Sequence, residues 1–352
     1  MSAPLLKVEN LGKTFAIKGG FLGRARGGVQ AVADVSFSLA AGETLAIVGE
    51  SGCGKSTTGR ALMRLIEPSA GQVWLDGEEI TALAPGALQA ARRNMQMIFQ
   101  DPFGSLNPRM TVRETLMEPL ALHGLARGEA ARARIDELLT TVGLGPHHAD
   151  RYPHEFSGGQ RQRICIARAL ATRPRLIVCD EAVSALDVSV QAQIVNLLQD
   201  LQAEHGMAYV FISHDLSVVR HISDRVAVMY LGRMVEEAPV DALFARPRHP
   251  YTRLLLEAAP RPVPGLRAAA APMKGETPSA LKPPPGCAFH PRCPLATDRC
   301  RTERPAPRLV GPTRVACHHA ETEVPLAIGA APPASAAMAA RQRVLATARA
   351  GA

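Results

Sequence analysis

The sequence lacks the marks of a membrane-spanning or secreted protein. None of its 352 residues falls in a run approaching the roughly 18–20 apolar residues that a transmembrane helix needs. Its start, MSAPLLKVENLGK, does not have the charged-then-apolar layout of a signal peptide. Aromatic residues make up only 4%, with a single Trp, but hydrophobic residues reach 47%, enough for one large domain or two smaller ones. We therefore expect a cytosolic globular protein that does not itself cross a membrane.

The net charge is positive, +8, with a pI near 9.4, which permits contact with nucleic acid or with an anionic membrane surface. The basic residues are scattered, however, with local concentrations such as 13–26, 161–173 and 299–308. A basic surface that faces anionic substrates or lipids explains this pattern more simply. We expect no nucleic-acid partner.

Along most of the chain, short β-branched runs alternate with stretches of helical periodicity, which predicts a parallel sheet with crossover helices. Apolar residues recur at helical spacing in 129–142 and 190–201, and Gly143 is suited to end the first of these helices. The segment 225–238 has the pattern of two strands around a turn at Gly232. Three runs have the composition of strands buried on both faces: TLAIVG (44–49), LIVCDE (176–181) and AYVFIS (208–213).

The most specific motif is GESGCGKST, which directly follows the first of these strands. It fits the pattern of Gly, four residues and Gly-Lys-Ser/Thr, whose glycines let backbone N–H groups turn inward around phosphates. Lys55 can reach the β- and γ-phosphates, and Ser56 can ligate Mg²⁺ at the start of a helix. The motif predicts an ATP site formed by Gly49, Glu50, Ser51, Gly52, Cys53, Gly54, Lys55, Ser56 and Thr57.

The run LIVCDE supplies the acidic partner that a site for a magnesium nucleotide needs. Asp180 at the end of the strand would lie beside the Mg²⁺, and Glu181 would polarise an attacking water as the general base. A strand that ends in Asp-Glu is common by itself. Together with the phosphate motif, it indicates hydrolysis of a nucleotide.

Between these two motifs lies FSGGQRQR (156–163). Ser157 and the two glycines after it would leave bare N–H groups at the start of a helix, a second anion-binding end in one chain. An ordinary serine N-cap followed by flexible glycines explains the same residues. Taken alone, the motif leaves both interpretations open.

Six motifs in this order resemble the ATP-binding subunit of an ABC transporter. They are GESGCGKST, IFQDP around Gln100, FSGGQRQR, LIVCDE, SALD (184–187) and ISHD around His214. The resemblance implies a P-loop NTPase of the α/β class, whose RecA-like core carries an antiparallel β subdomain and a helical subdomain. It also implies that two cassettes dimerise head to tail, with each ATP between the phosphate loop of one and the Ser-Gly-Gly-Gln signature of the other.

The resemblance also assigns roles to individual residues. Glu181 would be the catalytic base, Gln100 would ligate Mg²⁺ and sense the γ-phosphate, and His214 would contact the γ-phosphate. Phe15, in GKTF, matches the aromatic residue that stacks on adenine, although a buried strand residue is the alternative. The signature that meets the ATP of the partner subunit would consist of Ser157, Gly158, Gly159 and Gln160.

Two further segments, DPFGSLNPRMTV (101–112) and HPYTRLLLEAAP (249–260), resemble the oligopeptide/dipeptide importer subfamily. Such an importer implies a second ABC ATPase subunit, homologous but not identical, two transmembrane permease subunits and an external solute-binding protein. The chain would lie at the cytoplasmic face of the bacterial inner membrane as a peripheral protein. The alternative is a non-transport ABC ATPase of translation or DNA repair, which the single cassette and the short segment between loop and signature disfavour.

Four cysteines gather near the end of the chain: Cys287, Cys293, Cys300 and Cys317. A disulfide framework is disfavoured in the cytosol, and the chain has none of the closely spaced cysteine pairs typical of structural zinc. Wide, irregular spacing suits an iron–sulfur cluster, but spacing alone leaves a cluster, zinc and unligated thiols open. The importer resemblance favours a [4Fe–4S] cluster, because tails of that subfamily carry this arrangement and some hold one.

We expect three parts along the chain. An ABC cassette would span residues 1–258, with its helical subdomain at about 101–170. A C-terminal extension of the oligopeptide-transporter type, with the cysteine cluster, would span 259–320 after a linker rich in Pro, Ala and Gly. The Ala-rich residues 321–352 would form a mobile tail.

Overall fold

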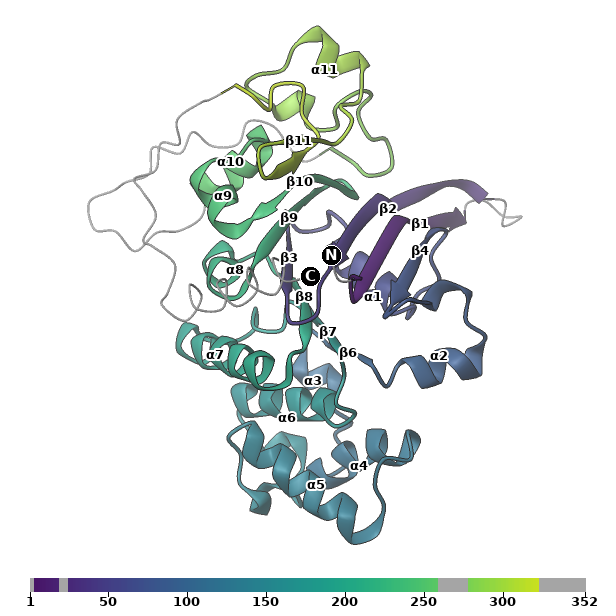
Figure 1. Ribbon diagram of the computed structural model, residues 1–352, viewed down its shortest axis with the longest axis vertical. Coiled ribbons are helices and arrows are strands. Elements are labelled where there is room, and N and C mark those ends of the chain that lie inside the picture. Colours follow the sequence, from purple (N-terminus) through teal and green to yellow (C-terminus); the bar gives the residue numbers. More distant parts are fainter. Residues whose placement is uncertain (1–2, 19–24, 259–277, 323–352) are drawn as a thin grey trace, which may run out of the picture.

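The computed structural model describes residues 3–18, 25–258 and 278–322. Its centre is an eight-stranded sheet in the order β11-β12-β10-β9-β3-β8-β7-β6 (Figure 1). The strands are β3 (Thr44–Val48), β6 (Met95–Ile98), β7 (Leu176–Asp180), β8 (Ala208–Ile212), β9 (Arg225–Tyr230), β10 (Arg233–Pro239), β11 (Arg308–Val310) and β12 (Thr313–Val315).

The middle of this sheet is parallel, from β6 through β7, β8 and β3 to β9. Every residue of β3, β7 and β8 is buried, since helices and a second sheet cover the two faces, and the runs are therefore almost wholly apolar. The three predicted buried strands are confirmed, each ending one residue earlier than expected. The residues just beyond their carboxyl ends therefore meet at one edge of the sheet.

Helices lie on both sides of the central sheet (Figure 1). Helix α1 (Lys55–Leu62) packs between β8 and the second sheet, whereas α7 (Val188–His205) and α8 (Leu216–Ile222) lie on the other side. Strand β10 turns back antiparallel to β9 at Gly232, as the sequence predicted, and leads into α9 (Val240–Ala245) and α10 (Pro250–Ala258).

The second sheet is antiparallel, in the order β2-β1-β4-β5. Its strands are β1 (Leu6–Lys18), β2 (Ala25–Leu39), β4 (Ala70–Leu75) and β5 (Glu78–Glu79). Alternate residues such as Leu6, Val8, Val35 and Val73 are buried against α1 and the central sheet. A 3₁₀ turn (Ile80–Ala82) and α2 (Pro85–Ala91) then lead back to β6.

A group of helices occupies the lower end of the molecule in Figure 1. They are α3 (Pro102–Ser105), α4 (Val112–Leu122), α5 (Gly128–Thr141) and α6 (Gly158–Leu170). Buried Leu116, Ile135 and Leu139 join them into one apolar core. Gly143, at φ +75°, follows the end of α5 as expected.

The C-terminal extension, here residues 278–322, packs against the cassette and adds strands to its central sheet. After a 3₁₀ turn (His290–Arg292) and α11 (Asp298–Thr302), β12 pairs antiparallel with β10 and extends the central sheet. The sequence did not predict these strands. Most of the predicted linker and nearly all of the predicted mobile tail lie outside the described residues. None of the helices in the described ranges is both long and apolar enough to span a bilayer.

Candidate functional site

The phosphate loop, Gly49–Thr57, leaves the carboxyl end of β3 and enters α1. Gly54 has φ +107°, and a Cβ at this position would overlap the carbonyl oxygen of Ala31. At Gly49, φ is +153° and a Cβ would overlap the carbonyl oxygen of Met229. Only glycine fits at these two positions, because backbone from other strands approaches the loop so closely.

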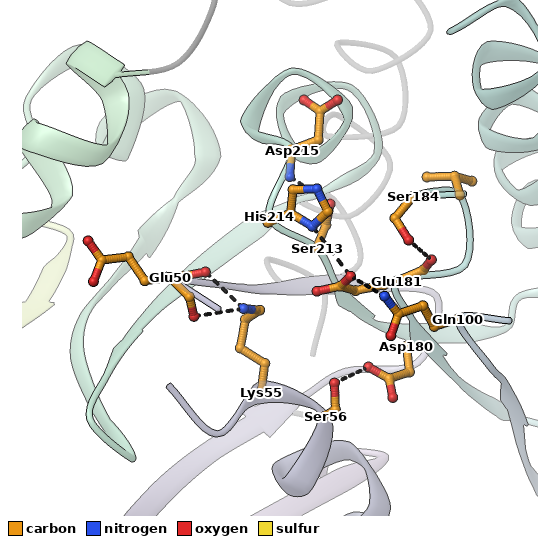
Figure 2. Close-up of polar contacts among 12 residues, drawn as sticks. Glu50, Lys55, Ser56, Gln100, Asp180, Glu181, Ser184, Ser213, His214 and Asp215 are labelled. Atoms are coloured by element: carbon orange, nitrogen blue, oxygen red, sulfur yellow. Dashed lines mark hydrogen bonds and ion pairs between the residues drawn. The ribbon is translucent and has the colours of Figure 1, made fainter. Parts of the chain in front are cut away.

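Lys55 folds back over the loop. Its Nζ donates to the carbonyl oxygens of Gly49, at 2.8 Å, and Glu50, at 3.1 Å (Figure 2). The side chain is buried in the curve of the loop. The ammonium is thus already positioned where an anion in the loop would be bound.

A hydroxyl and a carboxylate meet below the loop. The Ser56 hydroxyl donates to Oδ1 of Asp180 at 2.7 Å, across from the carboxyl end of β7 (Figure 2). Burial raises the pKa of Asp180, although the hydrogen bond from Ser56 opposes this. These two oxygen ligands are of the hard kind that Mg²⁺ prefers, so the donor set fits that ion.

The three residues predicted to be catalytic, Gln100, Glu181 and His214, gather on the same edge of the sheet (Figure 2). Gln100 Nε2 donates to Glu181 Oε2 at 2.9 Å, and His214 Nδ1 lies 3.4 Å from the same oxygen. Glu181 has φ +48°, a left-handed conformation that costs a non-glycine residue about 1–3 kcal/mol. Its N–H donates to Ile212 O, and its own carbonyl accepts from the Ser184 hydroxyl, so the surrounding loops fix this strained backbone.

Phe15 and the signature belong to two other elements, β1 and α6. Phe15, on β1, is 43% exposed, with Lys13 Nζ 5.1 Å from its ring centroid, so it is not the buried strand residue of the alternative interpretation. Ser157 caps α6, accepting from the N–H of Gln160 at 3.3 Å, while Gln160 Oε1 accepts from the N–H of Ser157. In Figure 1, α6 lies below α1, among the helices at the lower end of the molecule.

Comparisons with known proteins identify the family. The model of the ABC transporter family matches residues 32–184, and that of the oligopeptide/dipeptide transporter C-terminal region matches residues 235–300. The "Probable peptide ABC transporter ATP-binding protein y4tS" of Sinorhizobium fredii is 57% identical to this chain over 90% of both sequences. The chain belongs to the ATP-binding proteins of the ABC transporter family. ATP-binding subunits of this family are ATPases.

Other relatives and solved structures agree with this. The oligopeptide transport ATP-binding protein AppF of Bacillus subtilis is 51% identical, over 89% of this chain and 97% of its own. The dimeric post-hydrolysis structure of the ATP-binding cassette MJ0796 with ADP and Pi shares 32% identity and a TM-score of 0.60. It covers 67% of this chain and 98% of its own, which confirms the cassette fold.

Two residues of the C-terminal part of this ABC ATPase contact the phosphate loop, and the sequence did not predict either contact. The Arg292 guanidinium donates to both carboxylate oxygens of Glu50, and the Glu50 N–H donates to the Tyr251 hydroxyl. Tyr251 lies in HPYTRLLLEAAP, the segment that resembles the importer subfamily, and Arg292 directly precedes Cys293. No spacing in the sequence indicates that either residue reaches a loop so far away in the chain.

The four C-terminal thiols lie near enough to one another to interact electrostatically. Burial, and to a smaller extent Cys287, Cys293 and Cys300, together raise the pKa of Cys317 to about 12. Cys300 Sγ lies 3.5 Å from His319 Nε2. Within residues 3–18, 25–258 and 278–322, however, no group of three or more His, Cys, Asp or Glu residues is arranged to hold a metal ion. The predicted metal site is therefore not confirmed.

Proposed function

We propose that this chain is the ATP-hydrolysing subunit of a membrane importer for di- or oligopeptides or a related small solute. One observation carries the proposal: Gln100 and His214 converge on the Glu181 carboxylate beside a phosphate loop. The cargo class is supported by relatives named for oligopeptide and di/tripeptide transport that cover about nine-tenths of this chain. Glutathione import proteins, of which this chain spans 41%, share 60% identity over the aligned part.

In this proposal the phosphate loop binds ATP through its N–H groups and Lys55, while adenine stacks on the exposed ring of Phe15. Ser56 and Asp180 would hold Mg²⁺, which supplies positive charge to the phosphates. Glu181 accepts a proton from the attacking water as the general base. Gln100 and His214 orient its carboxylate from two sides.

The signature, residues 157–160, would act on the ATP of a partner subunit. A head-to-tail dimer would bring the start of α6 in one subunit to the nucleotide in the phosphate loop of the other. We infer a similar but distinct second ATPase, two permease subunits and an external binding protein. The complex would place this chain peripherally at the cytoplasmic face of the inner membrane.

The Glu181→Gln variant tests the catalytic role. Removing the base should lower ATP turnover by at least about 100-fold while ATP stays bound, because Gln keeps the side-chain shape. Turnover and retained radiolabelled ATP are the two measurements. The exposed Glu204→Gln on α7 is the matched control and should keep the parent rate. A Glu181→Gln protein that hydrolyses ATP at the parent rate would contradict the assignment.

The alternative is a non-transport ABC ATPase, and a transport assay separates the two. In a strain that lacks this chain, uptake of a radiolabelled dipeptide or tripeptide should fall, and the intact chain but not Glu181→Gln should restore it. Unchanged uptake of di-, tri- and oligopeptides and of glutathione would refute the cargo class. The match to the transporter C-terminal region supports the transport reading.

For the C-terminal thiols we propose a [4Fe–4S] cluster held by Cys287, Cys293, Cys300 and Cys317. The number and nearness of the thiols support it, although no arrangement for a metal ion is found among the described residues. ATP hydrolysis needs no redox step, so the cluster would stabilise the extension. A broad visible absorption band and about four iron atoms per anaerobically purified chain are expected. Zinc instead of iron, or neither, would refute the cluster.

A further inference from the structure

One contact between the C-terminal extension and the cassette is made at Glu50, within the phosphate loop itself. Arg292 Nη1 donates to Glu50 Oε2 at 2.9 Å, and Nη2 donates to Oε1 at 2.8 Å. This is a bidentate salt bridge, the strongest arrangement of hydrogen bonds between Arg and a carboxylate. Solvent screens it little, since the side chain of Arg292 is 5% exposed and that of Glu50 is 18% exposed.

The backbone of the same loop residue is held from a second element. The N–H of Glu50 donates to the Tyr251 hydroxyl, on α10, at 2.8 Å. Tyr251 is fully buried, and its ring packs against Tyr230 and Phe289, with ring centroids 4.6 and 5.4 Å away. A ring so enclosed cannot shift freely, so Tyr251 and Arg292 together fix both the main chain and the side chain of Glu50.

The contact with Arg292 matters for ATP binding because Glu50 is negatively charged. A carboxylate within a phosphate loop repels the negatively charged phosphates of ATP, at short range and in a partly buried setting. In Figure 2 the Glu50 carboxylate points away from Lys55, and the pair with Arg292 accounts for this direction. The guanidinium both neutralises the carboxylate and keeps it turned from the place where the phosphates would lie.

We propose that Arg292 is a positioning residue for ATP binding: by pairing with Glu50, the C-terminal extension removes a repulsive charge from the phosphate loop. Arg292 does not touch the reacting atoms. It acts through Glu50 on the affinity for ATP rather than on the chemical step. The proposal rests on the proposed nucleotide-binding role of the loop.

The test compares three variants of the full chain with the parent by their KM for ATP and their kcat. Arg292→Gln should raise KM at least about tenfold with kcat changed less than about threefold, because the Glu50 carboxylate in the loop loses the positive charge of the guanidinium. The double variant Arg292→Gln with Glu50→Gln should recover KM to within about threefold of the parent, since the repulsive charge is gone. Arg299→Gln, which breaks an exposed pair with Glu303 in the same extension, should leave both constants unchanged.

Two outcomes would overturn the proposal. One is a KM for Arg292→Gln within twofold of the parent. The other is a raised KM that the Glu50→Gln change does not restore although thermal unfolding shows that both proteins are folded; Arg292 would then act only as a structural anchor. Lys55→Ala tests the loop itself: if it binds and hydrolyses ATP as the parent does, the proposed function fails, independently of the Arg292 result.

Discussion

His249, at the entrance to α10, is a buried histidine that does not belong to the ATP site. Its Nδ1 accepts the N–H of Tyr251 at 3.0 Å, so the ring proton of the neutral form lies on Nε2. The backbone N–H of His249 donates to the buried carboxylate of Glu236 at 2.9 Å. Burial lowers the pKa of His249 to about 3, because the charged ring would lose its hydration. The native protein therefore holds this histidine neutral.

The lowered pKa predicts a loss of stability in mild acid. The unfolded chain binds a proton near pH 6.5 and the native chain does not, so stability falls as pH falls from about 6.5 toward about 3. The loss should reach about 2 kcal/mol at pH 5. Denaturant unfolding at pH 7 and pH 5 measures it. His249→Asn, whose Oδ1 can still accept from Tyr251, should flatten the dependence, while the opposing raised pKa of Glu236 remains in both proteins. Equal slopes in the two proteins would contradict the prediction.

For single residues, the sequence predicted the site residues that belong to a local motif, but not the contacts between residues far apart in the chain. The phosphate loop, Asp180 and Glu181 each follow a buried strand, so their gathering at one sheet edge follows from parallel topology. The pair of Glu50 and Arg292 joins residues 242 positions apart. No periodicity or local propensity records such a contact, because only the docking of the extension creates it.

Two helices begin with the same kind of N-terminal cap. Thr111 caps α4 and Ser157 caps α6, and in both cases the third helical residue, Glu114 or Gln160, returns a hydrogen bond to the cap N–H. Each box satisfies two backbone donors that the helix leaves unpaired. Only the capping box at Ser157 lies in the signature. Comparing variants of Ser157 and Thr111 therefore distinguishes a helix-capping role from a nucleotide-binding role.

Ser157→Ala and Thr111→Ala should each lower the free energy of unfolding by about 1 kcal/mol, the ordinary effect of losing a cap. Only Ser157→Ala should also lower ATP turnover, by at least about tenfold, because it removes a proposed contact to the partner's ATP. Denaturant unfolding and steady-state hydrolysis measure the two effects. If both variants lose turnover equally, or neither does, the signature role of Ser157 is wrong, and the motif is an ordinary N-cap.

Helices and strands could be predicted from the sequence where the apolar pattern and the length of the segment indicate the same kind of element. The buried strands and the helix after Gly128 match because continuous apolar runs and helical spacing depend on neighbours in sequence. Helix α7 begins earlier than its apolar residues suggest, since Asp187 accepts from the N–H of Val190 and caps it. Strands β11 and β12 have three residues each and form by pairing with each other and, in the case of β12, with β10, so no local pattern marks them.

The whole molecule is joined by the way its C-terminal extension docks. Strand β12 continues the central sheet through β10, with Val315 opposite Glu236. Arg314, on the same strand, donates to the Ser36 carbonyl of β2 at 3.3 Å. The extension therefore contacts the central sheet, the antiparallel sheet and the phosphate loop. If β12 is released from β10, we therefore expect Arg292 to lose its contact with Glu50 as well.

Val315→Asp tests this coupling, because it buries a carboxylate at a side chain that is 1% exposed. The unpaired charge should cost at least about 2 kcal/mol and release the extension from β10. Faster proteolytic cleavage within residues 278–322 and a raised KM for ATP, as in Arg292→Gln, are then expected. Leu309→Asp, at a 75% exposed position of β11, is the matched control and should change neither. If cleavage accelerates while KM stays at the parent value, the extension does not hold Arg292 in place, and the contact at Glu50 forms without β12.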